Sequence, residues 1–199
     1  MLYNIAVILL RPIFFLFYNY RVTGRENIPE KGPYIVCANH VSAIDPIFIG
    51  IILPHKMHFM AKVELFKNWF IGGLLKTLGA FPIKRGEADL KSIKTSLRLL
   101  ADGKVLSLFP EGTRNKTSEI IAEPGIAMLS IKAKVPVLPI AIMSSYKFFN
   151  RTTIIIGKPL DLSEYYDKKL GSEEYTGISL GIMNKINELK KDENNENNS

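Results

Sequence analysis

Two short polar segments of the sequence carry the residue types that acid–base chemistry requires. Residues 39–45 (NHVSAID) place Asp45 five positions after His40, and residues 109–114 (FPEGTR) supply an acid and an arginine among small residues. Each segment follows a short apolar run of the kind that forms a buried strand. Ligands of α/β folds bind at the carboxyl ends of strands, so a histidine there is poorly explained as a core residue. The two segments therefore predict a catalytic site built on two strand ends.

The spacing of His40 and Asp45 predicts a turn between them. Residues five apart on one helix point about 140° away from each other and cannot share a face. A helix is expected to begin only at Asp45, because Pro46 is favoured at the first helical position. In a turn, Asp45 accepts a hydrogen bond from one imidazole nitrogen of His40, and the other nitrogen is free to take a proton from an alcohol. Asp45 can also be a plain helix N-cap, and the two roles are compatible.

Other chemistries have weaker support in the sequence. It contains no GxSxG motif, no Walker A motif and no GxGxxG after a strand. Cys37 lies in the middle of an apolar run, which favours a small buried residue over a thiol nucleophile. His55 and His58 have no acidic or cysteine ligand near them in sequence, so we expect no metal site and no cofactor. The most economical reading is that His40 deprotonates a substrate hydroxyl, which then acts as the nucleophile.

Three cations at the ends of expected elements fit a phosphorylated substrate. Lys62, Arg85 and Arg114 are predicted to converge on a phosphate, with the arginines binding in a bidentate manner. The alternative for each is a solvated surface charge, which is the usual role of lysine and arginine.

The segment FPEGTR supplies three further candidates for substrate binding. Gly112 lets the backbone approach a ligand, and Thr113 adds a hydroxyl donor. Glu111 is either a partner of the catalytic residues or a structural hydrogen-bond acceptor.

Apolar runs and helical periodicities alternate along the chain. They predict an α/β fold with a largely parallel or mixed central sheet flanked by helices. We expect a membrane-interface helix in residues 1–20, one domain over 21–190 and a disordered tail over 191–199. The expected strands are 34–38, 58–61, 79–84, 105–109, 137–143 and 152–156, and the expected helices are 45–53, 68–78, 87–101, 125–133 and 173–190.

The composition narrows the class of partner. The chain has 199 residues, a net charge of +7 and 47% hydrophobic residues. With a pI of about 9.4 and a mean hydropathy of +0.09, it suits a phosphorylated ligand, an anionic membrane or an acidic partner. Nucleic acid is disfavoured because the aromatic residues cluster near the N-terminus instead of interleaving with a basic face. A single cysteine permits no intrachain disulfide, which fits a reducing compartment.

The N-terminal segment predicts contact with a membrane. Residues 2–18 are nearly all apolar, and Arg11-Pro12 interrupts them. A helix of that length spans roughly 25 Å, short of the roughly 30 Å hydrocarbon core. We expect it to lie in one leaflet with Arg11, Arg21 and Arg25 toward the headgroups, at the cytoplasmic face of the cell membrane. The alternative is that the helix only packs on the domain.

Together these motifs resemble the glycerolipid acyltransferase family, and within it the 1-acylglycerol-3-phosphate acyltransferases. The resemblance rests on four blocks, which are residues 39–45, 62–85, 109–114 and 135–140. It implies that His40 is the general base, that Asp45 orients it, and that the second and third blocks bind glycerol phosphate. Residues 135–140 would form a core strand that shapes the site. The chain departs from many relatives at Glu123, where they have a lysine.

The resemblance implies esterification of the sn-2 hydroxyl of lysophosphatidate to give phosphatidic acid. The acyl donor would be acyl carrier protein or CoA. Two alternatives stay open: an acyltransferase for another lysolipid or glycerol phosphate, and a non-catalytic peripheral lipid-binding protein. The second does not require a histidine beside Asp45.

Overall fold

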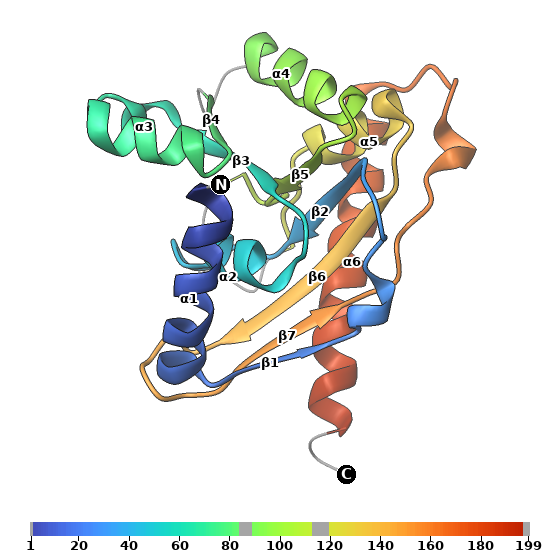
Figure 1. The fold of residues 1–199 in the computed structure, drawn as a ribbon. Coiled ribbons are helices and arrows are strands. Elements are labelled where there is room, and N and C mark those ends of the chain that lie inside the picture. The colour runs from blue at the N-terminus through green and yellow to red at the C-terminus, as the bar shows by residue number, and fades with distance from the viewer. Residues whose placement is uncertain (1, 84–88, 113–119, 197–199) are drawn as a thin grey trace.

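A seven-stranded sheet runs through the computed structural model, which describes residues 2–83, 89–112 and 120–196 (Figure 1). Its order is β1-β7-β6-β2-β5-β3-β4. Strands β6, β2, β5, β3 and β4 run parallel, while β7 pairs antiparallel with β6 and parallel with β1. The predicted α/β fold with a mixed central sheet is therefore confirmed. The strands are β1 Tyr20–Thr23, β2 Tyr34–Ala38, β3 Met57–Lys62, β4 Ala80–Ile83, β5 Val105–Leu108, β6 Val137–Ser144 and β7 Thr152–Ile156.

Helices cover both faces of the sheet. Successive side chains of a strand point to opposite faces, so a strand that is apolar throughout needs a helical layer on each side. In β2 every residue is buried. Tyr34, Val36 and Ala38 belong to a core shared with α1 and α2, whereas Ile35 and Cys37 belong to a core shared with α4, α5 and α6. In Figure 1, α1 and α6 accordingly lie on opposite faces. The helices are α1 Leu2–Tyr18, α2 Asp45–Ile52, α3 Trp69–Thr77, α4 Leu90–Ala101, α5 Gly125–Ala133 and α6 Ser172–Glu196.

Strand register brings the polar segments together. Cys37 of β2 is aligned with Leu108 of β5 on one side and with Pro139 of β6 on the other. All three strands run in the same direction, so the residues that follow them meet at one edge of the sheet. The site is built at this edge.

The C-terminus differs from expectation, whereas the N-terminal helix covers the expected residues 2–18. The last helix continues to Glu196, so residues 191–196, which we expected in a disordered tail, are helical. At the other end α1 is continuous across Arg11, with Pro12 inside it. Strand β1 had no expected counterpart, because its four residues are only partly buried and directly follow a helix.

Two basic residues near α1 make hydrogen bonds with α2. Arg11 Nε donates to the carbonyl of Ile51 at 2.6 Å, and Arg25 donates to the carbonyl of Ile52 at 3.3 Å. These carbonyls lie in the last turn of α2, where the helix has no partners of its own for them and favours a positive charge. Both residues are exposed and each bond uses one of the guanidinium's donors, so the expectation that Arg11 and Arg25 point to lipid headgroups stays a prediction.

One face of α1 packs on the domain. Tyr3, Phe14 and Tyr18 are buried, and Phe14 and Tyr18 each make an edge contact with Phe48 of α2. Among the residues that the structure describes, no helix has the length and apolarity needed to cross a membrane.

Candidate active site

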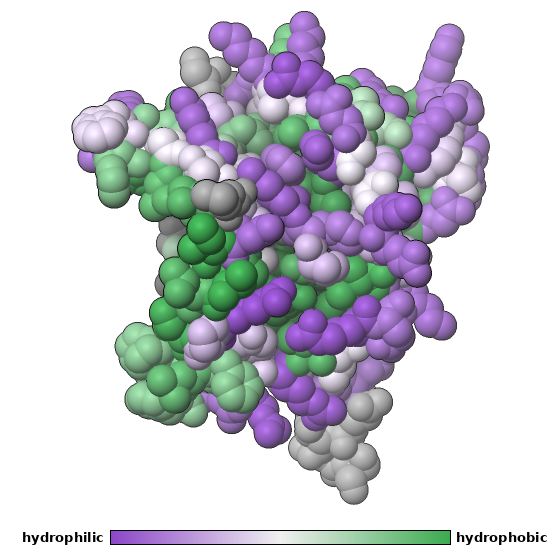
Figure 2. Space-filling view, viewed as in Figure 1, coloured by the Kyte–Doolittle hydropathy of each residue, from purple (hydrophilic) through white to green (hydrophobic). Residues whose placement is uncertain are grey.

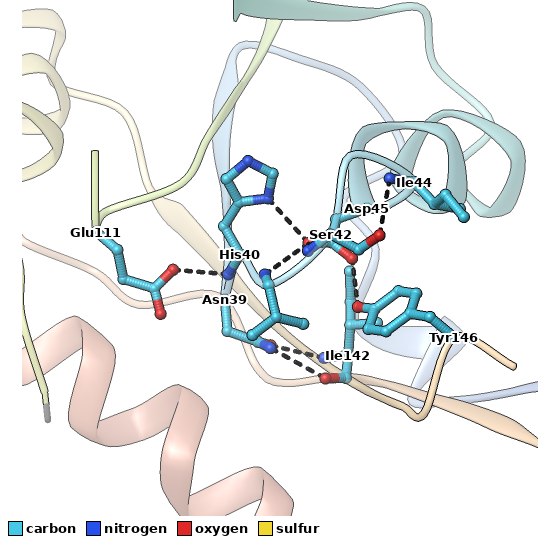
Figure 3. Close-up of polar contacts among 9 residues, drawn as sticks. Asn39, His40, Ser42, Ile44, Asp45, Glu111, Ile142 and Tyr146 are labelled. Carbon is cyan, nitrogen blue, oxygen red and sulfur yellow. Dashed lines mark hydrogen bonds and ion pairs between the residues drawn. The ribbon is translucent and has the colours of Figure 1, made fainter. Parts of the chain in front are cut away.

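The loop between β2 and α2 folds back on itself and joins His40 to Asp45 (Figure 3). His40 Nδ1 lies 2.9 Å from Asp45 Oδ2. The same oxygen accepts the backbone N–H groups of Val41 and Ser42, each at 2.8 Å. Asp45 is wholly buried, and these donors offset the loss of water around its carboxylate. The predicted turn and the predicted contact are both present.

The N-cap alternative for Asp45 is wrong. Ile44 occupies the N-cap position of α2 and makes no side-chain cap. The carboxylate of Asp45 is turned away from the helix and toward residues 40–42, because the loop offers it two backbone donors and the imidazole.

The contact fixes which imidazole nitrogen carries the proton. A carboxylate can only accept, so Nδ1 of His40 is the donor and Nε2 keeps its lone pair. Nε2 makes no hydrogen bond with any residue that the structure describes. The ring stacks on Phe109 at a centroid distance of 4.1 Å and an interplanar angle of 23°, which holds its plane. The arrangement is that of a general base oriented by an acid.

Asn39 anchors the start of this loop to the neighbouring strand. Its side-chain amide donates to the carbonyl of Ile142 at 3.0 Å, and its carbonyl accepts the Ile142 N–H at 2.8 Å. The amide thus replaces a backbone peptide and extends the pairing with β6 by one step after the main chain of β2 has turned away.

Glu111 holds the backbone of His40 from the other side. Its Oε2 accepts the His40 N–H at 2.7 Å, and the side chain is buried. Burial raises the pKa of Glu111 to about 7, and the charge of Asp45 adds to this, against the opposing effects of the His40 N–H and Lys190. Burial lowers the pKa of Lys190 on α6, while Glu111 raises it. Glu111 therefore accepts a hydrogen bond from the backbone of His40, which fits either of the roles expected for it.

Gly112 is required by the backbone itself. It has φ +64°, and a Cβ at this position would lie 3.0 Å from Cγ of Glu123. The structure thus places the carboxylate side chain of Glu123 against Gly112, where many relatives were expected to have a lysine.

The predicted phosphate-binding residues are only partly covered. Arg85, Thr113 and Arg114 lie outside the described residues. Lys62 ends β3 at the same edge of the sheet as His40, is half exposed, and pairs with Glu64 at 3.5 Å. The structure therefore joins His40, Asp45 and Glu111, but it records no contact between Lys62 and these three.

Sequence reasoning missed Tyr146, whose hydroxyl donates to Asp45 Oδ1. It lies 101 positions from Asp45, in a segment with no recognisable motif, so no local signal identifies it. Lys190 was missed as a neighbour of the site for the same reason, whereas Phe109 lies in the quoted motif FPEGTR but was assigned no role.

Cysteine and the remaining histidines do not join the site. Burial raises the pKa of the Cys37 thiol well above its ordinary value, which suits a buried core residue. His55 contacts the Tyr34 hydroxyl at 3.0 Å and the Glu30 carbonyl at 2.9 Å, so both of its nitrogens are engaged. Within the described ranges no three of His, Cys, Asp and Glu gather to hold a metal ion.

Comparisons with known proteins show which proteins this chain is similar to. A 1-acyl-sn-glycerol-3-phosphate acyltransferase of Bacillus subtilis is 31% identical over 176 residues, which are 85% of this chain and 87% of the relative. One of Streptococcus pneumoniae is 27% identical over 175 residues, covering 84% of this chain and 64% of the relative. Among solved structures, the 1-acyl-sn-glycerophosphate acyltransferase PlsC of Thermotoga maritima superimposes with a TM-score of 0.68 at 26% identity, covering 91% of this chain and 76% of that one.

A family model described as acyltransferase matches residues 19–143, which include β2, the His40–Asp45 turn, Glu111 and most of β6. The chain therefore belongs to the acyltransferase family.

Proposed function

We propose that this protein transfers an acyl group from a thioester to the sn-2 hydroxyl of 1-acylglycerol 3-phosphate and so forms phosphatidic acid. The observation that carries the proposal is the buried contact of 2.9 Å that orients His40 at the carboxyl edge of the sheet, where its Nε2 makes no hydrogen bond with a described residue. The names of the relatives from Bacillus subtilis and Streptococcus pneumoniae support lysophosphatidate as the acceptor.

The reaction follows from the placement of protons. Nε2 of His40 takes the proton of the sn-2 hydroxyl while that oxygen attacks the thioester carbonyl. The negative charge of Asp45 stabilises the imidazolium that forms. The tetrahedral intermediate then breaks its C–S bond, the ester remains on the glycerol, and the thiolate recovers the proton from the imidazolium. No other group has to be oxidised or reduced.

The acceptor's phosphate is assigned to cations that follow parallel strands at the same edge. Lys62 ends β3, and Arg85 and Arg114 come soon after β4 and β5 in the sequence. Charge-assisted hydrogen bonds to phosphate are about twice as strong as neutral ones, which suits a headgroup that has to be held while its hydroxyl reacts.

The assay that tests the proposal measures phosphatidic acid formed by purified protein from lysophosphatidate, with acyl-CoA and acyl carrier protein supplied as separate donors. Lysophosphatidylcholine and glycerol 3-phosphate serve as competing acceptors. Turnover with lysophosphatidate well above turnover with the other two supports the proposal. A preference for either of them would reassign the acceptor.

His40→Ala should lower turnover roughly 100-fold or more, because the reaction loses its general base. His58→Ala is the matched control, since His58 is half-buried and bonds the carbonyl of Val105 at 3.2 Å, away from the site. Near-normal turnover of H40A with an unchanged circular dichroism spectrum would leave only lipid binding as the role of this surface.

We also propose that the protein docks on an anionic membrane through an apolar band along one side. One end of the band is α3. Lys56 connects α3 to α1, because its Nζ donates to the carbonyl of Thr77 at 3.1 Å and lies over the ring of Tyr3 on α1. At the other end, the ring of Phe17 on α1 packs against Phe148 and Phe149. Figure 2 shows hydrophobic residues along this side of the molecule. The band comprises the exposed residues Leu2, Ile5, Ile8, Leu9, Ile13, Phe15, Leu16, Trp69, Phe70, Ile71, Leu74, Phe148 and Phe149.

Exposed cations flank the band and supply attraction to anionic lipid. They are Lys67 and Lys76 at the ends of α3, and Lys147 and Arg151 beside the two phenylalanines. An apolar face bordered by basic residues is the pattern of an element that lies in the interface.

Point substitutions test the band without removing α1, whose buried face is part of the core. Leu16→Ser should weaken binding to vesicles of phosphatidylglycerol and phosphatidylcholine roughly tenfold, because a leucine side chain contributes about 1.5–3 kcal/mol when buried. Leu90→Ser is the control, since Leu90 and Leu16 are each 66% exposed but Leu90 lies on α4, outside the band. Equal binding of the two variants would refute docking through α1.

A further inference from the structure

Tyr146 holds the oxygen of Asp45 that the histidine does not use. Its hydroxyl donates to Oδ1, whereas Oδ2 accepts His40 Nδ1 and the two backbone N–H groups of the loop. Figure 3 shows the phenol approaching Asp45 from the side opposite His40. Both oxygens of the carboxylate are thus fixed by donors from different parts of the chain.

The segment after β6 is arranged to deliver this hydroxyl. The hydroxyls of Ser144 and Thr152 bond at 2.7 Å between β6 and β7, and Ser144 Oγ accepts the Tyr146 N–H at 3.0 Å. Tyr146 itself has φ +56°, in the left-handed region that a residue with a bulky side chain rarely adopts. Its ring packs on the core shared with α1 and α2, while Phe148 and Phe149 point outward. A strained tyrosine turned inward beside outward-facing neighbours points to a function for its side chain.

The hydroxyl remains a donor throughout the working pH range. Burial raises the pKa of Tyr146, and the hydrogen bond to Asp45 raises it further. A phenol that keeps its proton cannot place a second negative charge beside Asp45, so it can only stabilise the carboxylate.

We propose that Tyr146 is a positioning residue for acyl transfer, which acts by locking the rotation of the Asp45 carboxylate so that Oδ2 faces His40. This inference rests on the proposed function. Without the hydroxyl, Oδ1 would be buried without its donor, and the carboxylate would be free to tilt toward other donors. The imidazole would then lose its fixed orientation while substrate binding stayed intact.

The test compares Tyr146→Phe with Tyr34→Phe. Tyr34 is a suitable control because it is fully buried on the same face of the sheet and its hydroxyl contacts a different histidine, His55, at 3.0 Å. We expect Y146F to lower kcat roughly tenfold with the KM of lysophosphatidate changed less than about twofold, the scale of one hydrogen bond to a charged group. Y34F should leave kcat within about twofold of the wild type. Its free energy of unfolding should fall about as much as that of Y146F, because each variant loses one hydrogen-bonded hydroxyl.

A double-mutant cycle separates positioning from a general loss of stability. If Tyr146 acts by positioning the Asp45 side chain, adding Y146F to Asp45→Ala, which leaves no carboxylate or amide to position, should lower kcat little further, whereas independent effects would multiply. All variants are assayed below their unfolding temperatures, with circular dichroism spectra matching the wild type. A kcat of Y146F within twofold of the wild type, multiplying effects in the cycle, or an equal fall of kcat in Y34F would each overturn the proposal.

A second measurement needs no turnover. In the wild type, the Nδ1 proton of His40 should give a downfield proton resonance with the nitrogen shift of a donor, and Y146F should move or broaden it while Y34F does not. A wild type that makes no phosphatidic acid would refute the proposed function. An unchanged His40 resonance in Y146F would refute the role of Tyr146, whatever the activity.

Discussion

Replacing Asp45 by asparagine removes one charge from the site and preserves its shape. Three donors converge on Oδ2, which are His40 Nδ1 and the N–H groups of Val41 and Ser42. An amide NH₂ on that side would face all three donors, so the amide of Asp45→Asn has to turn its oxygen toward the loop. Its NH₂ then faces the Tyr146 oxygen, which can accept. The tautomer and orientation of His40 are therefore retained.

The magnitude follows from the lost charge. When His40 takes the substrate proton, the 2.9 Å contact becomes an imidazolium–carboxylate pair in the wild type but an imidazolium–amide pair in the variant. A hydrogen bond to a charged group contributes about 1.5–3 kcal/mol; the amide of D45N loses the part that comes from the carboxylate charge, while the charge of the imidazolium remains. Since about 1.36 kcal/mol corresponds to tenfold in rate, D45N should lower kcat by up to roughly 100-fold with little change in KM.

The assay is steady-state formation of phosphatidic acid with each substrate varied in turn, alongside urea unfolding of the same samples. Asp161→Asn is the control, because Asp161 accepts from the N–H and hydroxyl of Ser163 at an exposed turn away from the site. Wild-type kcat in D45N would show that Asp45 only organises the turn. Loss of activity together with loss of folding would show that its charge is needed for the loop itself.

Further outcomes are expected elsewhere at the site. Glu111→Gln should remove a pH dependence of stability. The pKa of Glu111 is about 7 in the folded protein, against an ordinary value of 4.5. The wild type should therefore be more stable than the variant by up to about 3 kcal/mol below pH 4.5, and this difference should disappear as the pH rises to about 7. Urea unfolding at several pH values measures the difference. Arg114→Ala and Arg85→Ala should raise the KM of the acceptor at least about tenfold and that of the donor much less, because each phosphate contact contributes about 1.5–3 kcal/mol; equal changes in both KM values would contradict an acceptor-phosphate site. Gly112→Ala should destabilise the protein by about 1 kcal/mol or more, because alanine is strained at the positive φ of this position. Gly73→Ala in α3 is the control and should not destabilise, since a Cβ there meets nothing within 4 Å. The melting temperatures of the two variants measure the difference.

Sequence periodicity predicted the parts of the fold that local interactions determine. Strands β2 and β7 and helix α5 have the predicted bounds, because an apolar run or a helical stripe is limited by Gly, Pro or polar residues on each side. The turn from His40 to Asp45 was predictable too. Pro46 is favoured at the first helical position, so the helix begins at the end of this segment and the residues before it have to turn.

Contacts that depend on strand register were not predictable from the sequence. Glu111 reaches the His40 N–H only because β2 and β5 are aligned through Cys37 and Leu108, and Tyr146 reaches Asp45 only because β6 lies on the other side of β2. The bond from Arg11 to a carbonyl 40 positions away, which the end of α2 leaves unpaired, also depends on how α1 packs on α2.

The sequence by itself therefore determined most of the elements, the acid–base pair and the family resemblance, because these reside in residues that are close along the chain. The tertiary structure alone decided which distant side chains hold that pair in place, because hydrogen bonds across 71 and 101 positions exist only once the order and register of the sheet have formed.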